Sequence, residues 1–273
     1  MDDTPNPNLT DPLFEAGPLP VLLAIFVVAL GAHVALGYLR QIERDRERRP
    51  VAAPFYVAMA SFSLGSAVWS AAILCISTLD VSFSIGYSKT GLALAWLVSL
   101  LGALLPLALL ARWKRAPAVG AAGLLLACSV VYTAMRLVDA LGLQPQFRWG
   151  LDALALSFPA VAAGAIAGIW IGLAHDPRGR TRRRWWRFGA AMMIGFTTVV
   201  GLSLVLAAVP LGVEVASEFQ KDVPRLVAGL GGGMMVPLVL AALALDLHMR
   251  QLRGHRSAGV APHRQRIRRR GER

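Results

Sequence analysis

Seven stretches of the sequence carry no charged residue, and each is long enough to cross a lipid bilayer as a helix. They cover residues 16–39, 50–79, 90–111, 116–135, 153–175, 188–213 and 226–245, and the shortest have 20 residues. Because an α-helix rises about 1.5 Å per residue and the hydrocarbon core is about 30 Å thick, about 20 apolar residues suffice. A β-barrel would need alternating polarity, whereas these stretches are apolar on every side. The pattern therefore predicts an all-α, polytopic membrane protein whose seven transmembrane helices occupy residues 18–249.

The basic residues are gathered on one side of the predicted membrane. Of the 28 Lys and Arg residues, 23 fall in the segments 40–49, 112–115, 176–187 and 250–273, and five fall on the opposite side. Cytoplasmic loops are enriched in Lys and Arg, so we expect segment 1–17 outside, the tail 250–273 in the cytoplasm and the chain in a bacterial inner membrane. The net charge of +12 then reflects topology, and we expect no nucleic-acid partner.

After the leading helix, the windows group into three hairpins that each start and end on the cytoplasmic side. An offset of 59 residues sets Ile73 of the first hairpin against Tyr132 of the second. The first hairpin contains Trp69-Ser70, and the second contains Tyr132-Thr133-Ala134-Met135. The third repeats the apolar and hydroxyl character of the others. The chain is thus predicted to be one leading helix followed by three helix-hairpin repeats.

This pattern resembles the MHYT family over roughly residues 20–245. Members of that family are bacterial seven-helix sensor domains built from three helix pairs, and the resemblance implies a sensory function and copper held by Met and His side chains. Ala71-Ala72 and Val130-Val131 occupy the Met-His positions here. The chain therefore resembles a degenerate member. Its remaining soft donors near the outer helix ends are Cys75 and Met135, which are candidates for a residual metal site or simply apolar fillers.

Polar uncharged residues recur on the second, fourth and sixth helices, where the resemblance would put the family motif. We expect a small-molecule site among them, and the alternative is that hydroxyls and small side chains serve close helix packing. The candidate ligand-binding residues are Ser66, Trp69, Ser70, Ser129, Tyr132, Thr133, Thr197 and Thr198. Glycines 229 and 231–233 indicate close packing, with a kink or hinge, in the last helix.

Charged residues at the helix ends suggest membrane anchoring. Arg182, Arg183, Arg184, Trp185 and Trp186 precede a spanning helix and have the composition of an interfacial anchor. The Arg-rich tail suits anionic lipid headgroups as partners. Arg136 and Asp139 are three residues apart and are expected to form an ion pair that ends the fourth helix.

No catalytic set, nucleotide-binding loop or paired zinc ligands is present in the sequence, so we expect a protein that is not an enzyme. The leading hypothesis is a sensory or regulatory membrane protein without an attached output enzyme, acting on a cytoplasmic signalling partner. The alternative is a transporter or handling protein for a small molecule or a lipid. No window has the acidic group that a coupled transporter usually keeps at mid-membrane, which favours the sensor.

Overall fold

The computed structural model describes residues 18–45, 52–78, 86–113, 115–144, 151–173, 180–209, 216–217, 219, 223–231, 236–247 and 249. The predicted segments 1–17 and 250–273 lie outside the described residues. Six helices are long and apolar enough to cross a membrane, which makes the chain a multi-pass α-helical membrane protein. They are α1 (Leu19–Asp45), α2 (Ala53–Ile76), α3 (Lys89–Arg112), α4 (Ala116–Asp139), α5 (Leu151–Leu173) and α6 (Arg180–Ala207).

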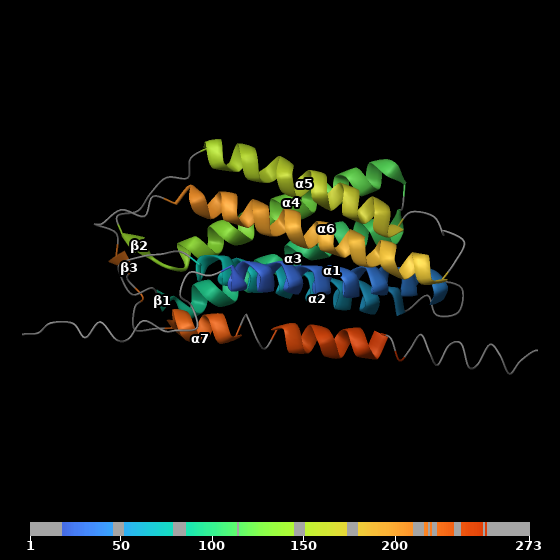
Figure 1. Ribbon diagram of the computed structural model, residues 1–273, viewed down its shortest axis with the longest axis horizontal. Helices are drawn as coiled ribbons and strands as arrows, with labels where there is room; N and C mark the ends of the chain where they lie inside the picture. The colour runs from blue at the N-terminus through green and yellow to red at the C-terminus, as the bar shows by residue number, and fades with distance from the viewer. Residues whose placement is uncertain are drawn as a thin grey trace, which may run out of the picture.

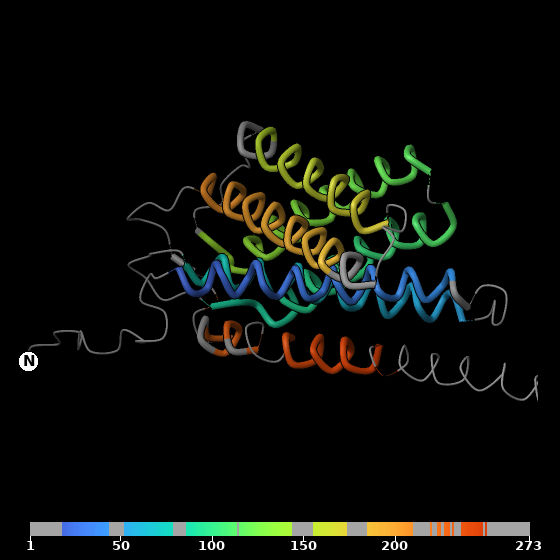
Figure 2. The backbone as a smooth tube through the Cα atoms, turned by 45° about the vertical axis from the view of Figure 1, so that its right-hand side comes forward, coloured from blue at the N-terminus to red at the C-terminus, as the bar shows by residue number. Residues whose placement is uncertain are grey.

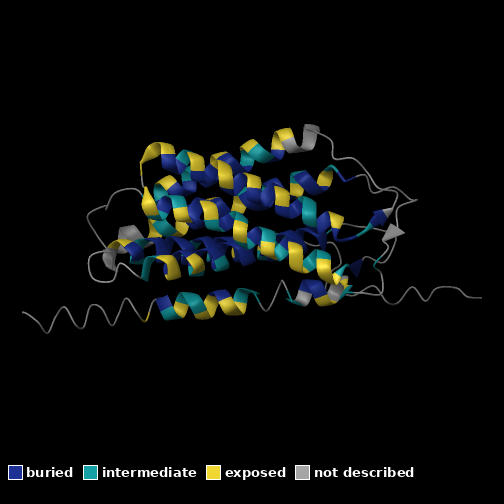
Figure 3. Ribbon diagram, turned by 180° about the vertical axis from the view of Figure 1, so that it is seen from behind, coloured by how far each residue is buried: buried dark blue, intermediate teal, exposed yellow. Residues whose placement is uncertain are grey.

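The six helices run side by side in one bundle (Figure 1), each contacts the next in sequence, and α6 contacts α1, so the contacts close into a ring. The even-numbered helices α2, α4 and α6 also contact one another across the middle. In the most apolar part of each span, 83% of residues are buried in α2 but only 28% in α3. Figure 3 shows the same division, with buried residues inside the bundle and exposed ones on its outer faces. Thus α2 belongs to the core, whereas α3 presents most of its surface to the surroundings.

A glycine lies at every contact around this ring. A Cβ atom built on any of them would come closer than 3 Å to an atom of the neighbouring helix. The contacts are Gly31 at α1–α2, Gly65 at α2–α3, Gly102 at α3–α4, Gly123 at α4–α5, Gly164 at α5–α6 and Gly195 at α6–α1. Small residues let helices approach closely where lipid gives no hydrophobic drive for their association. At these glycines, neighbouring helices therefore pack too closely to leave room for a larger side chain.

Helix starts and ends follow local sequence signals. Pro54 and Pro117 stand in the first turns of α2 and α4, where proline loses no helical hydrogen bond. Ser88 caps α3, its side chain accepting a hydrogen bond from the Gly91 N–H at 3.3 Å. Gly142 follows α4 with φ of 57°, a left-handed conformation that glycine adopts at low cost.

Four two-residue strands lie together at one end of the bundle, which we call the strand end. β1 (Gly86–Tyr87) pairs with β4 (Val223–Pro224), and β2 (Leu143–Gln144) pairs with β3 (Ala216–Ser217), both antiparallel. The Ser88 N–H also donates to the Ala140 carbonyl at 2.9 Å. The connections after α2, α4 and α6 are therefore tied to one another. The other end, with the exposed Arg112 and Arg115, is the basic end.

The last predicted span differs from one continuous helix. It contains α7 (Arg225–Leu230), which continues to Gly231, and a separate helix over Val236–Leu247, too short by itself to span a bilayer. We call residues 225–247 the C-terminal segment. In Figures 1 and 2 it lies beside α1 on the side away from α5. Seven continuous spanning helices are therefore not confirmed, and the predicted kink or hinge falls mostly on residues 232–235, which lie outside the described residues.

Candidate ligand-binding pocket

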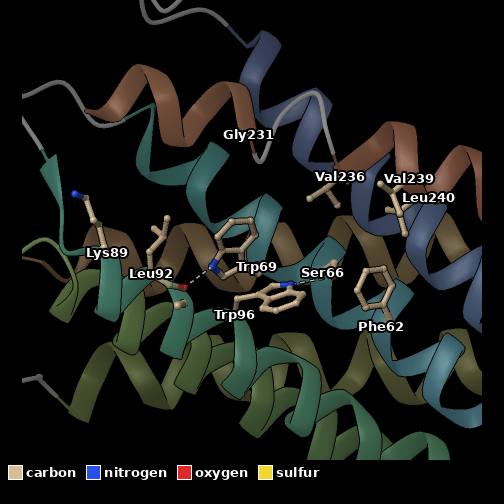
Figure 4. A pocket seen from close by; sticks show the side chains of 11 residues that line it. Phe62, Ser66, Trp69, Lys89, Leu92, Trp96, Gly231, Val236, Val239 and Leu240 are labelled. Atoms are coloured by element: carbon tan, nitrogen blue, oxygen red, sulfur yellow. Dashed lines mark hydrogen bonds between the residues drawn. The ribbon is translucent and has the colours of Figure 1, made fainter. Parts of the chain in front are cut away.

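A pocket of about 430 Å³ lies between α2, α3 and the C-terminal segment. Figure 4 shows aromatic side chains from α2 and α3 on one wall and the C-terminal segment opposite them. The lining residues are Phe62, Ser66, Trp69, Lys89, Leu92, Ala93, Trp96, Gly231, Val236, Val239 and Leu240. This volume is within the range of about 300–1,000 Å³ that is usual for small-molecule sites.

The polar edges of both indoles in the pocket are used in hydrogen bonds between α2 and α3. Trp96 Nε1 donates to Ser66 Oγ at 3.1 Å, and Trp69 Nε1 donates to the Leu92 carbonyl at 3.3 Å. A third bond joins the same helices, from Ser99 Oγ to the Gly65 carbonyl at 2.7 Å. Because these donors are satisfied, the indoles are fixed in position and offer the pocket mainly their apolar surfaces.

Aromatic packing extends this wall away from the strand end. Phe62 lies edge-on to Trp96, with ring centroids 6.2 Å apart and planes at 88°. This is a favourable arrangement, because the positive edge of one ring meets the negative face of the other. On the opposite wall, Leu240 of the C-terminal segment is fully buried. The pocket therefore suits an apolar body that can fill a flat, aromatic and aliphatic slot.

Among the described residues, Lys89 is the one charged residue that lines the pocket, and it stands at the strand end. Its side chain is exposed and, among the residues that the structure describes, makes no hydrogen bond or ion pair. It is also the first residue of α3, where the helix dipole places partial positive charge. A ligand with a negative end would meet attraction at this position.

The structure brings two of the eight predicted ligand-binding residues into this pocket, Ser66 and Trp69. The other six point in several directions. Ser129 packs against Gly102 of α3, and Thr197 packs against Gly164 of α5. The Thr197 hydroxyl donates to the Met193 carbonyl of its own helix at 2.9 Å, and Tyr132 is 51% exposed on the outside of α4. These residues therefore lie on several different helix surfaces and do not form one site.

Ser70, Thr133 and Thr198 are the predicted residues that are almost fully buried outside the pocket. Near the middle of the bundle, all six long helices contribute to an apolar cavity of about 20 Å³, with walls that include Leu64, Leu126 and Ile194. Of the described residues, the buried ones with polar side chains carry hydroxyls of Ser, Thr or Tyr, and none of them is charged. A buried charge is therefore lacking in the part of the bundle that the structure covers.

Cys75 and Met135 lie within about one turn of the strand ends of α2 and α4. Cys75 is buried and shares a hydrogen bond with the Ser203 side chain, and Met135 is partly buried against the core. His33, the only histidine that the structure describes, lies near the middle of α1. Within the described ranges, no three His, Cys, Asp or Glu residues are grouped as metal ligands would be. The described residues therefore group no further His, Cys, Asp or Glu donors with Cys75, and the residual metal site stays a prediction.

The predicted membrane anchor lies in the first turns of α6, which begins at Arg180, before the uncharged window. Arg182, Arg183 and Arg184 are helical, and their side chains are not among those described. Trp185 and Trp186 are 69% and 49% exposed. The ion pair expected at the end of α4 is confirmed, with Arg136 Nη1 3.3 Å from Asp139 Oδ2.

Three features of the pocket were not singled out by sequence reasoning: Phe62, Trp96 and Lys89. Trp96 and Lys89 belong to α3, which lies outside the set of helices on which the expected site was placed. The available signal was the spacing of Lys89, Leu92, Ala93 and Trp96, which puts them on one face of a helix. The same spacing occurs by chance in many apolar helices, so it does not identify a pocket by itself.

Fold and pocket together define a multi-pass α-helical membrane protein with an apolar pocket at its periphery. Comparison with known proteins adds no relative: no family model, no curated protein and no solved structure matches the chain. The resemblance to the MHYT family thus stays a prediction from the sequence.

Proposed function

We propose that this protein is a sensory or regulatory membrane protein whose input is an apolar or amphiphilic small molecule bound in the pocket between α2, α3 and the C-terminal segment. The pocket itself supports the proposal, because its aromatic wall is fixed by hydrogen bonds and its volume suits a small ligand. The MHYT-like sequence pattern is a second, weaker support. The output would pass to a cytoplasmic partner through the basic end.

The packing of the core favours sensing over transport. A transported molecule needs a path between helices, and coupled transporters usually carry charged groups at mid-membrane. In the described bundle a cavity lined by all six long helices measures about 20 Å³ and has apolar walls, and the larger pocket lies to one side of it. Binding at the periphery can change helix packing without moving a ligand across the membrane.

The proposed topology follows the charge distribution. The basic end would face the cytoplasm of a bacterial cell, with the Arg-rich tail on anionic lipid headgroups. The strand end would then face outward, so the pocket would be filled from the outer half of the bilayer.

A binding assay in lipid nanodiscs tests the proposal. The probe is a long-chain dibromo fatty alcohol, because bromine quenches indoles that it contacts. We expect saturable quenching of Trp69 and Trp96, and its loss in Ala93→Phe, since Ala93 lines the pocket and is exposed at its edge. The matched control is Leu94→Phe, which adds a ring to the neighbouring exposed position outside the pocket. Quenching that is unaffected by Ala93→Phe would contradict ligand binding in this pocket.

A second measurement separates a sensor from a transporter. In sealed liposomes, a sensor should bind the probe and leave its rate of exchange between leaflets unchanged. We also expect probe binding to change hydrogen-exchange protection at the basic end, around Arg112 and Arg115. Protein-dependent exchange of the probe between leaflets, without a change at the basic end, would favour the transporter alternative.

A further inference from the structure

We propose that the natural occupant of the pocket is a membrane phospholipid with an anionic headgroup, held by an acyl chain against Trp69 and Trp96 and by its headgroup at Lys89. This inference rests on the proposed function, since it names the ligand class for the same pocket. Three observations carry it: the position of the charge, the direction in which the pocket opens and the use of its polar atoms.

The charged side chain of Lys89 lies at the depth of the lipid headgroups. Lys89 begins α3, and the uncharged span starts directly after it, which puts its side chain at the boundary between membrane and water. Trp96 is seven residues further along the same helix, so the pocket reaches about 10 Å into the apolar layer. A molecule that fills it therefore has one polar end and a long apolar body, arranged along the membrane normal.

The pocket opens sideways onto the surface that faces lipid. Ala93 and Val239 line it and are exposed, so its edge runs between α3 and the C-terminal segment. The neighbouring Leu94 and Leu238 are 48% and 65% exposed, as expected on a surface that acyl chains cover. A ligand already dissolved in the bilayer can enter by this edge, whereas a water-soluble ligand would have to cross apolar surface.

Among the described polar groups that line the pocket, the Lys89 ammonium is the one without a hydrogen-bond or ion-pair partner. Both indole N–H groups and Ser66 Oγ are engaged in hydrogen bonds between α2 and α3. Lys89 remains as the exposed cation, and the positive end of α3 adds to its field. Charge complementarity therefore selects an anionic lipid over a zwitterionic one of the same chain length.

The experiment compares dibromo phosphatidylglycerol with dibromo phosphatidylcholine of the same acyl chains, each titrated into nanodiscs of unlabelled phosphatidylcholine. The protein retains Trp69 and Trp96 and has its other five tryptophans, of seven in all, replaced by phenylalanine. A specific site saturates at low mole fraction of the brominated lipid, whereas the surrounding lipid quenches in proportion to its amount. We expect saturable quenching with about a fivefold preference for the anionic lipid, the size expected for one cation beside anionic headgroups.

Matched variants assign the preference to Lys89. Lys89→Gln should abolish it, and Lys89→Arg should keep it. Arg136→Gln, which removes a strand-end cation outside the pocket, should also leave it unchanged. Native mass spectrometry of the protein with all its tryptophans, counting retained anionic lipids, gives the same comparison if the tryptophan-reduced chain does not fold.

The possible results separate the two proposals. Equal quenching by both lipids, with no effect of Lys89→Gln, would overturn the anionic-lipid inference and leave the pocket with a different apolar ligand. Strictly proportional quenching by both lipids, together with no binding of the fatty alcohol, would overturn this inference and the proposed function alike. Preference for the anionic lipid that persists in Ala93→Phe would place the lipid elsewhere and also overturn the inference.

Discussion

At the scale of single residues, the α2–α3 contact depends on tryptophan and serine side chains that satisfy each other in an apolar setting. An indole has a large apolar surface and one N–H donor, and leaving that donor unpaired away from water costs free energy. Ser66 supplies the acceptor for Trp96, and it is 4% exposed. The pair thus makes the pocket wall rigid while keeping its exposed surface apolar.

A double-mutant cycle on Trp96 and Ser66 measures this contribution. Trp96→Phe and Ser66→Ala should each destabilise the protein, and the double variant should lose less than the sum of the two. We expect a coupling of about 0.6 kcal/mol, typical of hydrogen bonds between membrane helices. Thermal unfolding in detergent gives the values. Trp170→Phe is the control, because Trp170 is 52% exposed on α5 and makes no hydrogen bond with the described residues; full additivity would contradict the assigned bond.

The metal content of the purified protein tests the residual metal site at Cys75 and Met135. A copper ion needs several soft donors in one place, and the described surroundings of Cys75 supply a thiol that is already hydrogen-bonded to Ser203. We expect less than stoichiometric copper in purified protein, measured by elemental analysis after growth with added copper. The control is Cys75→Ser with Met135→Leu, which should contain the same amount. Stoichiometric copper lost in that double variant would show that the residual site binds metal.

The sequence predicted only two of the residues that line the pocket, and the reason is physical. Ser66 and Trp69 were identified because polar and aromatic residues stand out in an apolar helix, but the direction in which each points depends on helix rotation. In α2 the buried share of 83% leaves no clear polar face from which rotation could be read. Lys89 was counted only among the five basic residues on the outer side, since only the fold brings it beside the C-terminal segment.

At the scale of helices, glycines determine how close neighbouring elements come. Gly195 of α6 is the sharpest case, because a Cβ there would lie 2.7 Å from the Ile25 carbonyl oxygen and 3.0 Å from the Ala29 nitrogen of α1. Both atoms belong to the backbone, so a side-chain rotation cannot relieve the clash. A larger residue must push the two helices apart.

We therefore expect Gly195→Ala to destabilise the protein by roughly 1–3 kcal/mol, the usual cost of overpacking. Gly120→Ala is the matched control in α4, where nothing lies within 4 Å of the added Cβ. That change should be neutral or stabilise by up to about 1 kcal/mol, because alanine favours the helix. Unfolding temperatures in one detergent compare the two directly. Equal effects of both substitutions would contradict the close α1–α6 contact.

The helices themselves were the most predictable elements. Absence of charge over about 20 residues is a requirement of the bilayer, and it located six spans correctly. Helix ends were less predictable: α6 begins at Arg180, eight residues before its uncharged window, because arginines fit well in a helix that extends beyond the apolar layer. The last window is described as two separate helical stretches, Arg225–Leu230 and Val236–Leu247, so the seventh span stays a prediction.

At the scale of the whole molecule, the C-terminal segment decides which side of the membrane holds the tail. Six spans alone would leave both termini on the same side, and a seventh crossing separates them. α7 contacts β1 and β4 at the strand end, and Leu247 packs on Gly37 of α1, eighteen residues beyond Leu19. At about 1.5 Å per residue this is roughly 27 Å of depth, close to the thickness of the hydrocarbon core. We therefore expect the C-terminal segment to make the seventh crossing.

Reporter fusions test this topology. We expect a fluorescent protein fused after Arg273 to be fluorescent in bacterial cells, because it stays in the cytoplasm. Alkaline phosphatase fused after Ala207, where α6 ends at the strand end, should be active, because it is exported. Replacing Gly231 by leucine is informative as well: a continuous helix should still cross, so the reporter after Arg273 should stay fluorescent. If phosphatase is active and the fluorescent protein is not when each is fused after Arg273, the C-terminal segment does not cross, and the basic tail lies outside despite the charge distribution.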